Sequence, residues 1–289
     1  MKTLRKTTML RHMIRDGCVA MPGAFNAATA RLIERAGFSS VYVSGAGLAN
    51  ATAGVPDTGL LTLAEVAQLA GYIARAVKIP VLADADTGFG GLRETAHAVR
   101  EFERAGLAGM HIEDQVFPKR CGHLAGKEVV PVKSFCQKIR AAVRAKSDPD
   151  FVIVARTDAR AVEGFDAAVR RAEAYLDAGA DAIFPEALES EREFREFAKR
   201  IHAPLMANMT EFGRSPLLSV RRLAAMGYRM VIFPLTAFRA AMHTEAACLR
   251  DLKRSGSQHP WLARMQTRAE LYDLLGYDPK GGDVPAGGA

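Results

Sequence analysis

The feature of this sequence that most constrains its fold is a regular alternation of short apolar runs with longer amphipathic segments. The apolar runs hold many β-branched and aromatic residues, as buried strands do, whereas the longer segments have helical spacing. The predicted strands are 19–21, 40–43, 81–83, 109–112, 151–155, 182–184, 204–207 and 230–233. The predicted helices are 25–36, 63–77, 92–105, 133–146, 165–178, 191–200, 215–226 and 236–253.

Eight successive strand–helix units favour a closed barrel. Because each crossover carries a helix, neighbouring strands are expected to run parallel. Eight such units within roughly 250 residues are typical of the (β/α)8, or TIM-type, barrel. A doubly wound open sheet is the alternative, but the turn after the first predicted strand lacks the GxGxxG pattern of a dinucleotide fold.

A single domain is expected over the whole chain, 1–289, with the barrel at about 17–254. A further helical piece at 262–275 lies in an extension of about 260–277, and we expect it to pad the barrel or to reach a neighbouring subunit. The tail at 278–289 is rich in glycine and is expected to be flexible.

Charge and cysteine content narrow the class of protein. The formal charge of +7 does not mark a nucleic-acid-binding surface, because basic and acidic residues are interleaved and no basic run carries aromatics. No apolar run reaches the roughly 18 residues that cross a bilayer. The basic N-terminal segment also lacks the apolar core of a signal peptide. The four cysteines are dispersed, so we expect free thiols in the cytoplasm, with no nucleic-acid or membrane partner.

Residues that can bind or react follow most of the predicted strands. They are Ser44, Asp84, Asp86, Glu113, Arg156, Glu186, Asn208 and Thr210. In a (β/α)8 barrel the C-terminal strand ends converge on one face, where the active site is built. Each residue alone could be an ordinary turn former. Several acids at neighbouring strand ends would repel one another, so together they indicate a bound cation or a basic partner.

The pair Asp84 and Asp86 is the predicted metal site. Two carboxylates at this spacing can reach one cation where a strand gives way to a loop, and oxygen ligands favour Mg²⁺, with Mn²⁺ as the alternative. Glu113 is expected to assist through a water, and His111 to lie in the barrel core or behind the metal ligands. The competing interpretation makes Asp86 a helix N-cap.

A thiol stands among basic residues in the predicted loop at 119–123, Lys-Arg-Cys-Gly-His. Nearby cations lower the pKa of a thiol, so we expect Cys121 to be activated by Lys119, Arg120 and His123. Gly122 allows close approach of the backbone to a ligand. The alternative is a cysteine that only packs, which is how we interpret Cys18, Cys136 and Cys248.

Three arginines are candidates for binding carboxylates, because a guanidinium group forms bidentate hydrogen bonds with them. Arg156 is supported by its position at a strand end. Arg239 and Arg268 lie in predicted helical segments and could equally be surface residues.

Ordered motifs along the chain resemble a known family. The segments 84–90 (DADTGFG), 111–115 (HIEDQ) and 119–123 (KRCGH) resemble the isocitrate lyase and phosphoenolpyruvate mutase superfamily, and within it the 2-methylisocitrate lyase family. Supporting segments are 44–45, 56–59, 155–159, 184–187, 208–213 and 266–268. The resemblance covers about Arg11 to Tyr277 and departs at Ala46, where glycine is common in the family.

The resemblance implies a Mg²⁺-dependent carbon–carbon lyase that splits (2S,3R)-2-methylisocitrate, a tricarboxylate, into pyruvate and succinate in the methylcitrate cycle of propionate breakdown. It implies that Asp84 and Asp86 hold Mg²⁺. The substrate contacts expected on this basis are Ser44, Gly45, Ala46, Asp57, Cys121, Gly122, Arg156, Glu186, Asn208, Met209, Thr210, Arg239 and Arg268. It further implies a homotetramer in which C-terminal helices are exchanged between subunits.

The chemistry of such a cleavage assigns further roles. The succinate half develops carbanion character that must be stabilised and protonated, and we expect Cys121 to be the acid, with Lys119 and His123 tuning it. The group that removes the hydroxyl proton is left open between Tyr42, Asp57 and a metal-bound water. Gly122 and Gly126 suggest that this loop moves to cover the substrate.

Other activities stay open at this point. They are isocitrate lyase, oxaloacetate decarboxylase, phosphonomutase and, from a different class, a non-catalytic barrel that only binds. The chain lacks the long insertions common in isocitrate lyases, and Phe184 and Leu235 could form a pocket for a methyl group. At least a tenfold preference for 2-methylisocitrate over isocitrate is expected, or about 1.4 kcal/mol.

Overall fold

A computed structural model describes residues 4–124 and 126–279 of the chain. Its strands are β1 Val19–Ala24, β2 Val41–Val43, β3 Val81–Asp84, β4 Gly109–Glu113, β5 Val152–Thr157, β6 Ala182–Pro185, β7 Leu205–Asn208 and β8 Tyr228–Phe233. They pair in parallel, in sequence order, and β1 pairs with β8 to close a barrel. The predicted (β/α)8 barrel is confirmed, and the open-sheet alternative is wrong.

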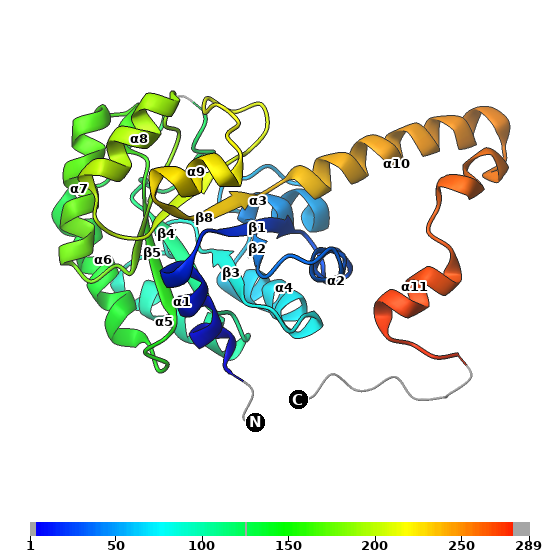
Figure 1. Ribbon diagram of the computed structural model, residues 1–289, viewed down its shortest axis with the longest axis horizontal. Coiled ribbons are helices and arrows are strands. Elements are labelled where there is room, and N and C mark those ends of the chain that lie inside the picture. The colour runs from blue at the N-terminus through cyan, green and yellow to red at the C-terminus, as the bar shows by residue number, and fades with distance from the viewer. Residues whose placement is uncertain (1–3, 125, 280–289) are drawn as a thin grey trace.

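Helices surround this barrel (Figure 1). They are α2 Ala27–Arg35, α4 Leu63–Ala76, α5 Leu92–Arg104, α6 Val132–Ala145, α7 Phe165–Asp177, α8 Glu191–Arg200 and α9 Val220–Met226. Short turns follow two strands: α3 Gly45–Leu48 with η1 Ala49–Ala53 after β2, and η2 Ala159–Ala161 after β5. Apolar side chains form two clusters, one between strands and helices and one inside the barrel. Burial on both sides of the strands explains their nearly continuous apolar runs.

The helix α1, Lys6–Asp16, was not among the predicted elements. Its apolar side chains Leu10 and Ile14 are buried with the cluster inside the barrel. Its polar face is tied to the surrounding loops, where Arg11 donates to Asp181 at 2.9 Å. The helix carries many charged residues and only a narrow apolar stripe, so its hydrophobic signal is weak.

Two predicted helices are partly wrong. The segment predicted at 215–226 becomes helical only at Val220, because Ser219 caps the helix by accepting from the Arg222 N–H at 3.3 Å. The segment predicted at 262–275 is broken: a 3-10 turn, η3 His259–Arg264, precedes α11 Arg268–Leu275. Thr267 and Glu270 form a capping box that starts α11 afresh.

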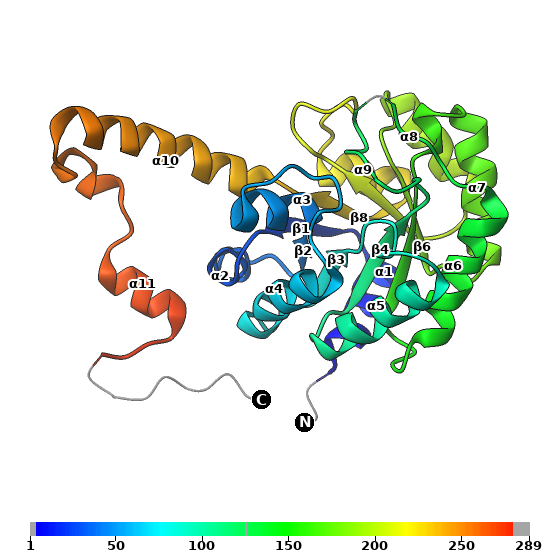
Figure 2. The same cartoon turned by 180° about the vertical axis from the view of Figure 1, so that it is seen from behind.

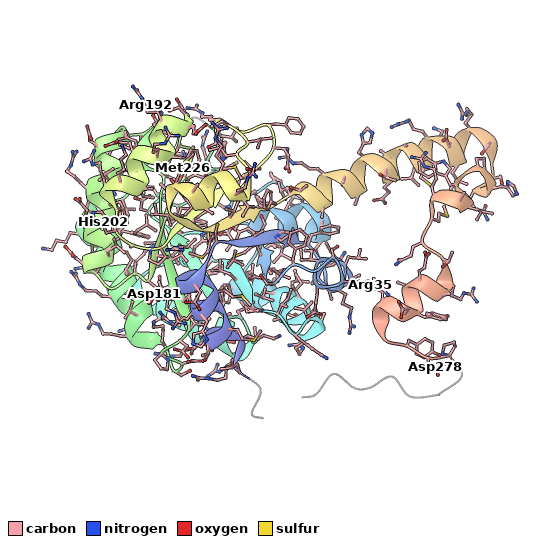
Figure 3. The ribbon with its side chains drawn as sticks, viewed as in Figure 1. Arg35, Asp181, Arg192, His202, Met226 and Asp278 are labelled. Carbon is pink, nitrogen blue, oxygen red and sulfur yellow. The ribbon has the colours of Figure 1, made fainter. Side chains whose placement is uncertain are left out.

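The C-terminal part of the chain leaves the barrel as an arm. The helix α10, Thr236–Ser255, extends away from the other helices (Figure 2) and, along its whole described length, buries no side chain. The arm returns through α11, which meets α2: Arg31 donates to the Leu274 carbonyl at 3.4 Å, and Arg35 pairs with Asp273. Figure 3 shows Arg35 on the side of α2 toward α11.

Two further points concern the ends of the chain and the membrane. Residues 280–289 of the predicted flexible tail lie outside the described part. Over residues 4–124 and 126–279, no helix is both long and apolar enough to cross a membrane.

Candidate active site

The C-terminal ends of the strands surround a cavity of about 60 Å³. Its lining comes from the strand ends and the loops after them: Tyr42, Ser44, Ala46, Asp57, Asp84, Cys121, Gly122, His123, Arg156, Phe184, Glu186, Asn208, Thr210, Ile232, Pro234 and Leu235. Residues far apart in sequence thus meet at the face where such barrels build active sites.

One side of the cavity is a turn of carboxylates. Asp84 ends β3, and its Oδ1 accepts the backbone N–H of Asp86 at 3.0 Å. Its Oδ2 accepts the N–H of Gly45 at 3.2 Å. Lys119 lies between two acids: its Nζ is 2.8 Å from Oδ1 of Asp86, and it also pairs with Asp57. The helix N-cap interpretation of Asp86 is wrong, because α5 begins at Leu92.

These carboxylates suit a hard cation. Burial raises the pKa of Asp86 to about 6. Lys119 lowers this pKa, whereas the carboxylates of Asp84 and Asp57 raise it. Burial also raises the pKa of Glu113 well above its usual range, and its Oε1 has no hydrogen-bond partner among the described residues. No three His, Cys, Asp or Glu side chains in the described ranges form a complete metal cage. Two carboxylates with water and substrate oxygens are the arrangement that Mg²⁺ accepts.

His111 lies inside the barrel behind this turn. Its Nε2 is 2.7 Å from the Tyr42 hydroxyl and 3.5 Å from Oδ1 of Asp84. Burial lowers the pKa of His111 to about 4, so the ring is neutral near pH 7. A neutral imidazole can exchange a hydrogen bond with Tyr42 and fix the direction of that hydroxyl toward the cavity.

The opposite side of the cavity is organised by Arg156, at the end of β5. Its Nε lies 2.9 Å from Oδ2 of Asp158 and 3.2 Å from Oε2 of Glu113. Its Nη1 lies 3.3 Å from Oε2 of Glu186, and its guanidinium group stands over the Phe184 ring at 5.1 Å. Three acids therefore hold one cation rigidly at the cavity wall, and a guanidinium group binds carboxylates through its N–H donors.

Cys121 stands between these two sides of the cavity. The prediction that its thiol pKa is lowered is wrong. Burial raises the pKa of its thiol, and this outweighs the lowering by the backbone of His123 and by Arg156. The ammonium group of Lys119 pairs with Asp57 and Asp86. The contact of Arg120 is made by its backbone N–H, which donates to Gln115 at 2.9 Å. The thiol therefore stays protonated near neutral pH.

The thiol loop, residues 119–124, lies directly on the cavity. A Cβ on Gly122 would collide with the side chains of Arg156 and Glu186, so this close approach requires glycine. The remaining cavity is far below the roughly 300–1,000 Å³ typical of ligand sites. The described conformation is therefore a closed one, in which the thiol loop leaves little room at the strand ends.

Several residues predicted to contact substrate do not line this cavity. Met209 packs in the outer core, where its sulfur accepts from the Leu218 N–H at 3.2 Å. Arg239, on α10, donates to the Glu211 carbonyl at 3.0 Å and stacks on Phe212 at 5.2 Å. Arg268 begins α11, out on the arm. Gly45 contributes its backbone to Asp84 instead.

Two charged residues of this region were missed by the sequence analysis. Lys127 is buried, and its Nζ lies 2.7 Å from Oδ1 of Asp158. Asp158 in turn holds Arg156. Asp158 lies within the supporting segment 155–159, where it was given no role, and Lys127 lies four residues after the 119–123 segment. The signals that could have found them were an acid two residues after the strand-end arginine and a lysine directly after Gly126.

Comparison with known proteins gives consistent matches. The family model described as "Phosphoenolpyruvate phosphomutase" matches residues 10–253. A 2-methylisocitrate lyase of Aeropyrum pernix is 52% identical over 275 residues, covering 94% of this chain and 88% of the relative. A probable 2-methylisocitrate lyase of Corynebacterium glutamicum is 56% identical, covering 89% and 85%.

Solved structures agree. A 2,3-dimethylmalate lyase, described as a PEP mutase/isocitrate lyase superfamily member, superposes with a TM-score of 0.90 at 37% identity, covering 95% of this chain and 92% of the other. A phosphonopyruvate hydrolase solved with oxalate and Mg²⁺ superposes with a TM-score of 0.86 at 33% identity, covering 94% and 95%.

Proposed function

The chain belongs to the phosphoenolpyruvate phosphomutase family of the PEP mutase/isocitrate lyase superfamily, and we propose that it is a Mg²⁺-dependent lyase that cleaves 2-methylisocitrate into pyruvate and succinate. One observation carries the proposal: the Asp84 carboxylate, which accepts the Asp86 N–H, shares one small cavity with a protonated thiol and a braced arginine. Relatives that carry this activity in their names are 52% and 56% identical over most of the chain.

Asp84 and Asp86 would hold the metal, with Glu113 and His111 behind them. The match to a superfamily member solved with Mg²⁺ supports that ion, with Mn²⁺ as the alternative. Bound there, Mg²⁺ supplies Lewis-acid stabilisation for the oxygen that turns from hydroxyl into carbonyl during cleavage. Lys119 pairs with Asp86 and Asp57 and so keeps the carboxylate turn in place.

The substrate carboxylates would be held by cations and polar groups around the cavity. Arg156 would bind a carboxylate through its guanidinium N–H groups. Asn208 is oriented by Glu186, because its Nδ2 lies 3.3 Å from Oε2 of that residue. Ser44, Gly45, Ala46, Gly122 and Thr210 complete the surroundings. Met209 and Arg239 lie outside the cavity, so we assign them a supporting role at the strand end and the mouth.

Cleavage breaks the bond between the carbinol carbon and the neighbouring carboxylate-bearing carbon. The hydroxyl proton leaves, the carbinol carbon becomes the keto carbon of pyruvate, and the electron pair of the broken bond stays on the succinate half. Cys121 then gives its thiol proton to that carbanion and is later reprotonated by solvent. The acceptor of the hydroxyl proton is Tyr42, Asp57 or a water at the metal site, and the first two line the cavity. Burial raises the pKa of Tyr42 well above its usual range, so this phenol could accept the proton only by passing its own to His111.

The nearest alternatives differ at the methyl group. Phe184 and Leu235 both line the cavity and offer apolar surface to a methyl substituent, which isocitrate lacks. This supports 2-methylisocitrate over isocitrate as the preferred substrate. The identities above 50% to 2-methylisocitrate lyases argue against a decarboxylase, a phosphonomutase or a non-catalytic barrel.

The arm supports the proposal of a homotetramer with exchanged helices. Where an eighth helix would cover the barrel, a largely apolar groove of about 470 Å³ opens between α2, α9 and the start of α10. A second copy's α10 has the unburied side chains to fill it. In that assembly Arg268 would reach the cavity of a neighbouring subunit, because the arm carries α11 away from the strands of its own chain (Figure 1). Light scattering before and after removal of residues 257–289 tests this.

A cytoplasmic location is part of the same proposal. All four cysteines, Cys18, Cys121, Cys136 and Cys248, are free thiols. A reducing compartment keeps them so, and the proposed catalytic acid requires a free thiol.

The experiment that tests the activity measures pyruvate with lactate dehydrogenase and NADH, using 2-methylisocitrate as substrate, with and without EDTA. Pyruvate and succinate in equal amounts, lost with EDTA and restored by Mg²⁺, support the proposal. Absence of pyruvate from the folded, Mg²⁺-supplied protein contradicts it.

A further inference from the structure

Lys127 is a buried cation that the proposed reaction does not use. Its side chain is 1% exposed. Its ammonium group has two acceptors on opposite sides: Oδ1 of Asp158 at 2.7 Å, and the carbonyl oxygen of Gly122 in the thiol loop. A buried ammonium group is costly unless it is paired and hydrogen-bonded, so these contacts account for its place in the closed conformation.

The first acceptor leads to the substrate arginine. Asp158 also binds Arg156 through both carboxylate oxygens, at 2.9 Å from Nε and 3.2 Å from Nη2. The backbone N–H of Asp158 donates to Asp114 at 2.8 Å, which fixes the backbone that carries this carboxylate. Asp158 is thus shared by two cations, one facing the cavity and one beneath the loop.

The second acceptor leads to the thiol. Gly122 follows Cys121 directly, and its carbonyl is the loop atom that Lys127 binds. The loop's base is already closed by a short antiparallel bridge between Gln115 and Val129, with the Val116 N–H donating to Glu128 at 2.9 Å. Lys127 reaches from this base to the centre of the thiol loop.

We propose that Lys127 is a positioning residue: it holds the thiol loop closed and sets the place of Cys121 relative to Arg156, by binding Gly122 and Asp158 at once. Opening of the loop separates Lys127 from the Gly122 carbonyl while the Asp158 contact remains. The consequence for catalysis rests on the proposed lyase function, whereas the consequence for the loop does not.

The test compares Lys127→Met, which keeps the length of the side chain but removes its donors, with the wild type. Lys133→Met is the matched control, since Lys133 is exposed in the first turn of α6. Hydrogen–deuterium exchange of the Arg120 and Leu124 amides, bound to Gln115 and Cys121 in the closed loop, is measured without substrate. We expect about tenfold faster exchange there in Lys127→Met.

Steady-state kinetics give the second readout. We expect kcat to fall about 30-fold while KM changes less than about threefold, because the loss lies in the alignment of the acid and not in ground-state binding. Lys127→Gln, which keeps an amide NH2 as donor group, should lose less kcat. It replaces Lys127→Met in both measurements if that variant does not fold.

Unchanged exchange in the loop, or a kcat within about threefold of wild type, overturns the proposal. Uniformly faster exchange across the barrel also overturns it, because Lys127 would then serve general stability. If wild-type protein releases no pyruvate, the proposed function fails by itself, and the exchange data alone decide whether Lys127 holds the loop.

Discussion

His123 joins the thiol loop to Glu186: its Nε2 lies 2.8 Å from Oε1 of that carboxylate. Its Nδ1 accepts the backbone N–H of Arg214 at 2.9 Å, so the ring proton is on Nε2 and faces Glu186. Burial alone would raise the pKa of Glu186, but Arg156 and His123 hold it well below its usual range. His123 therefore holds the closed loop against Glu186 and is not placed to charge the thiol.

Two replacements of His123 should separate its two contacts. In His123→Gln the amide can still donate to Glu186, whereas in His123→Asn the side-chain oxygen can still accept from Arg214. Losing a close polar contact with a charged group costs about 2 kcal/mol, so we expect kcat/KM to fall about 30-fold in His123→Asn and less in His123→Gln. Pyruvate assays measure both. The reverse order would show that the Arg214 contact matters more.

Cys121→Ser should lower kcat at least about 100-fold, because a serine hydroxyl is a much poorer acid toward a carbanion. KM should stay within about threefold, since the side chains are of similar size. The matched control is Cys248→Ser, on the arm, which should behave as wild type. A Cys121→Ser protein with wild-type kcat would remove the thiol from the mechanism.

The raised pKa of Cys121 has its own consequence for pH dependence. An acid acts in its protonated form, which is present below its pKa and lost as pH rises through it. Burial raises the pKa of this thiol, so the alkaline fall in kcat should lie above the pH at which an ordinary thiol ionises. Iodoacetamide, which needs thiolate, should label Cys121 at pH 8 more slowly than free cysteine; faster labelling would contradict the protonated state.

The sequence predicted the fold well because each strand is buried on both sides and each unit repeats the same local signals. It failed where local signals were weak or interrupted. The charged helix α1 shows only a narrow apolar stripe, and the break before α11 depends on a capping box within an otherwise helical pattern. The sequence of α10 carries no local signal for its direction away from the barrel. That direction depends on the surface against which the helix packs.

The site was predictable as a set of residue types at strand ends, but not as a set of partners. Lysine is usually exposed, so sequence alone gave no reason to bury Lys127. The basic residues beside Cys121 suggested a lowered pKa, yet Lys119 is drawn to Asp57 and Asp86. Burial decides whether the thiol pKa is raised or lowered, and sequence composition does not show the burial of individual residues.

Removal of metal should abolish activity and lower stability. A ligand at 100 times its Kd stabilises the folded state by about 2.7 kcal/mol, so Mg²⁺ should raise the Tm of the wild type measurably. Asp84→Asn should lose both the activity and the Tm shift, whereas Asp16→Asn, at an exposed position on α1, should keep both. The same Mg²⁺-dependent Tm shift in Asp84→Asn would place the metal elsewhere.

The apolar wall of the cavity should set the preference for a methylated substrate. Leu235 lines the cavity directly before α10, and Leu235→Phe adds volume where we place the methyl group. One methyl in such a pocket is worth about 1–3 kcal/mol, so we expect kcat/KM for 2-methylisocitrate to fall at least about tenfold while that for isocitrate changes little. The two substrates are followed through released pyruvate and glyoxylate. Leu92→Phe, on the exposed start of α5, controls for the added ring. An equal loss of kcat/KM for both substrates would mean that Leu235 shapes the whole cavity and does not distinguish the methylated substrate.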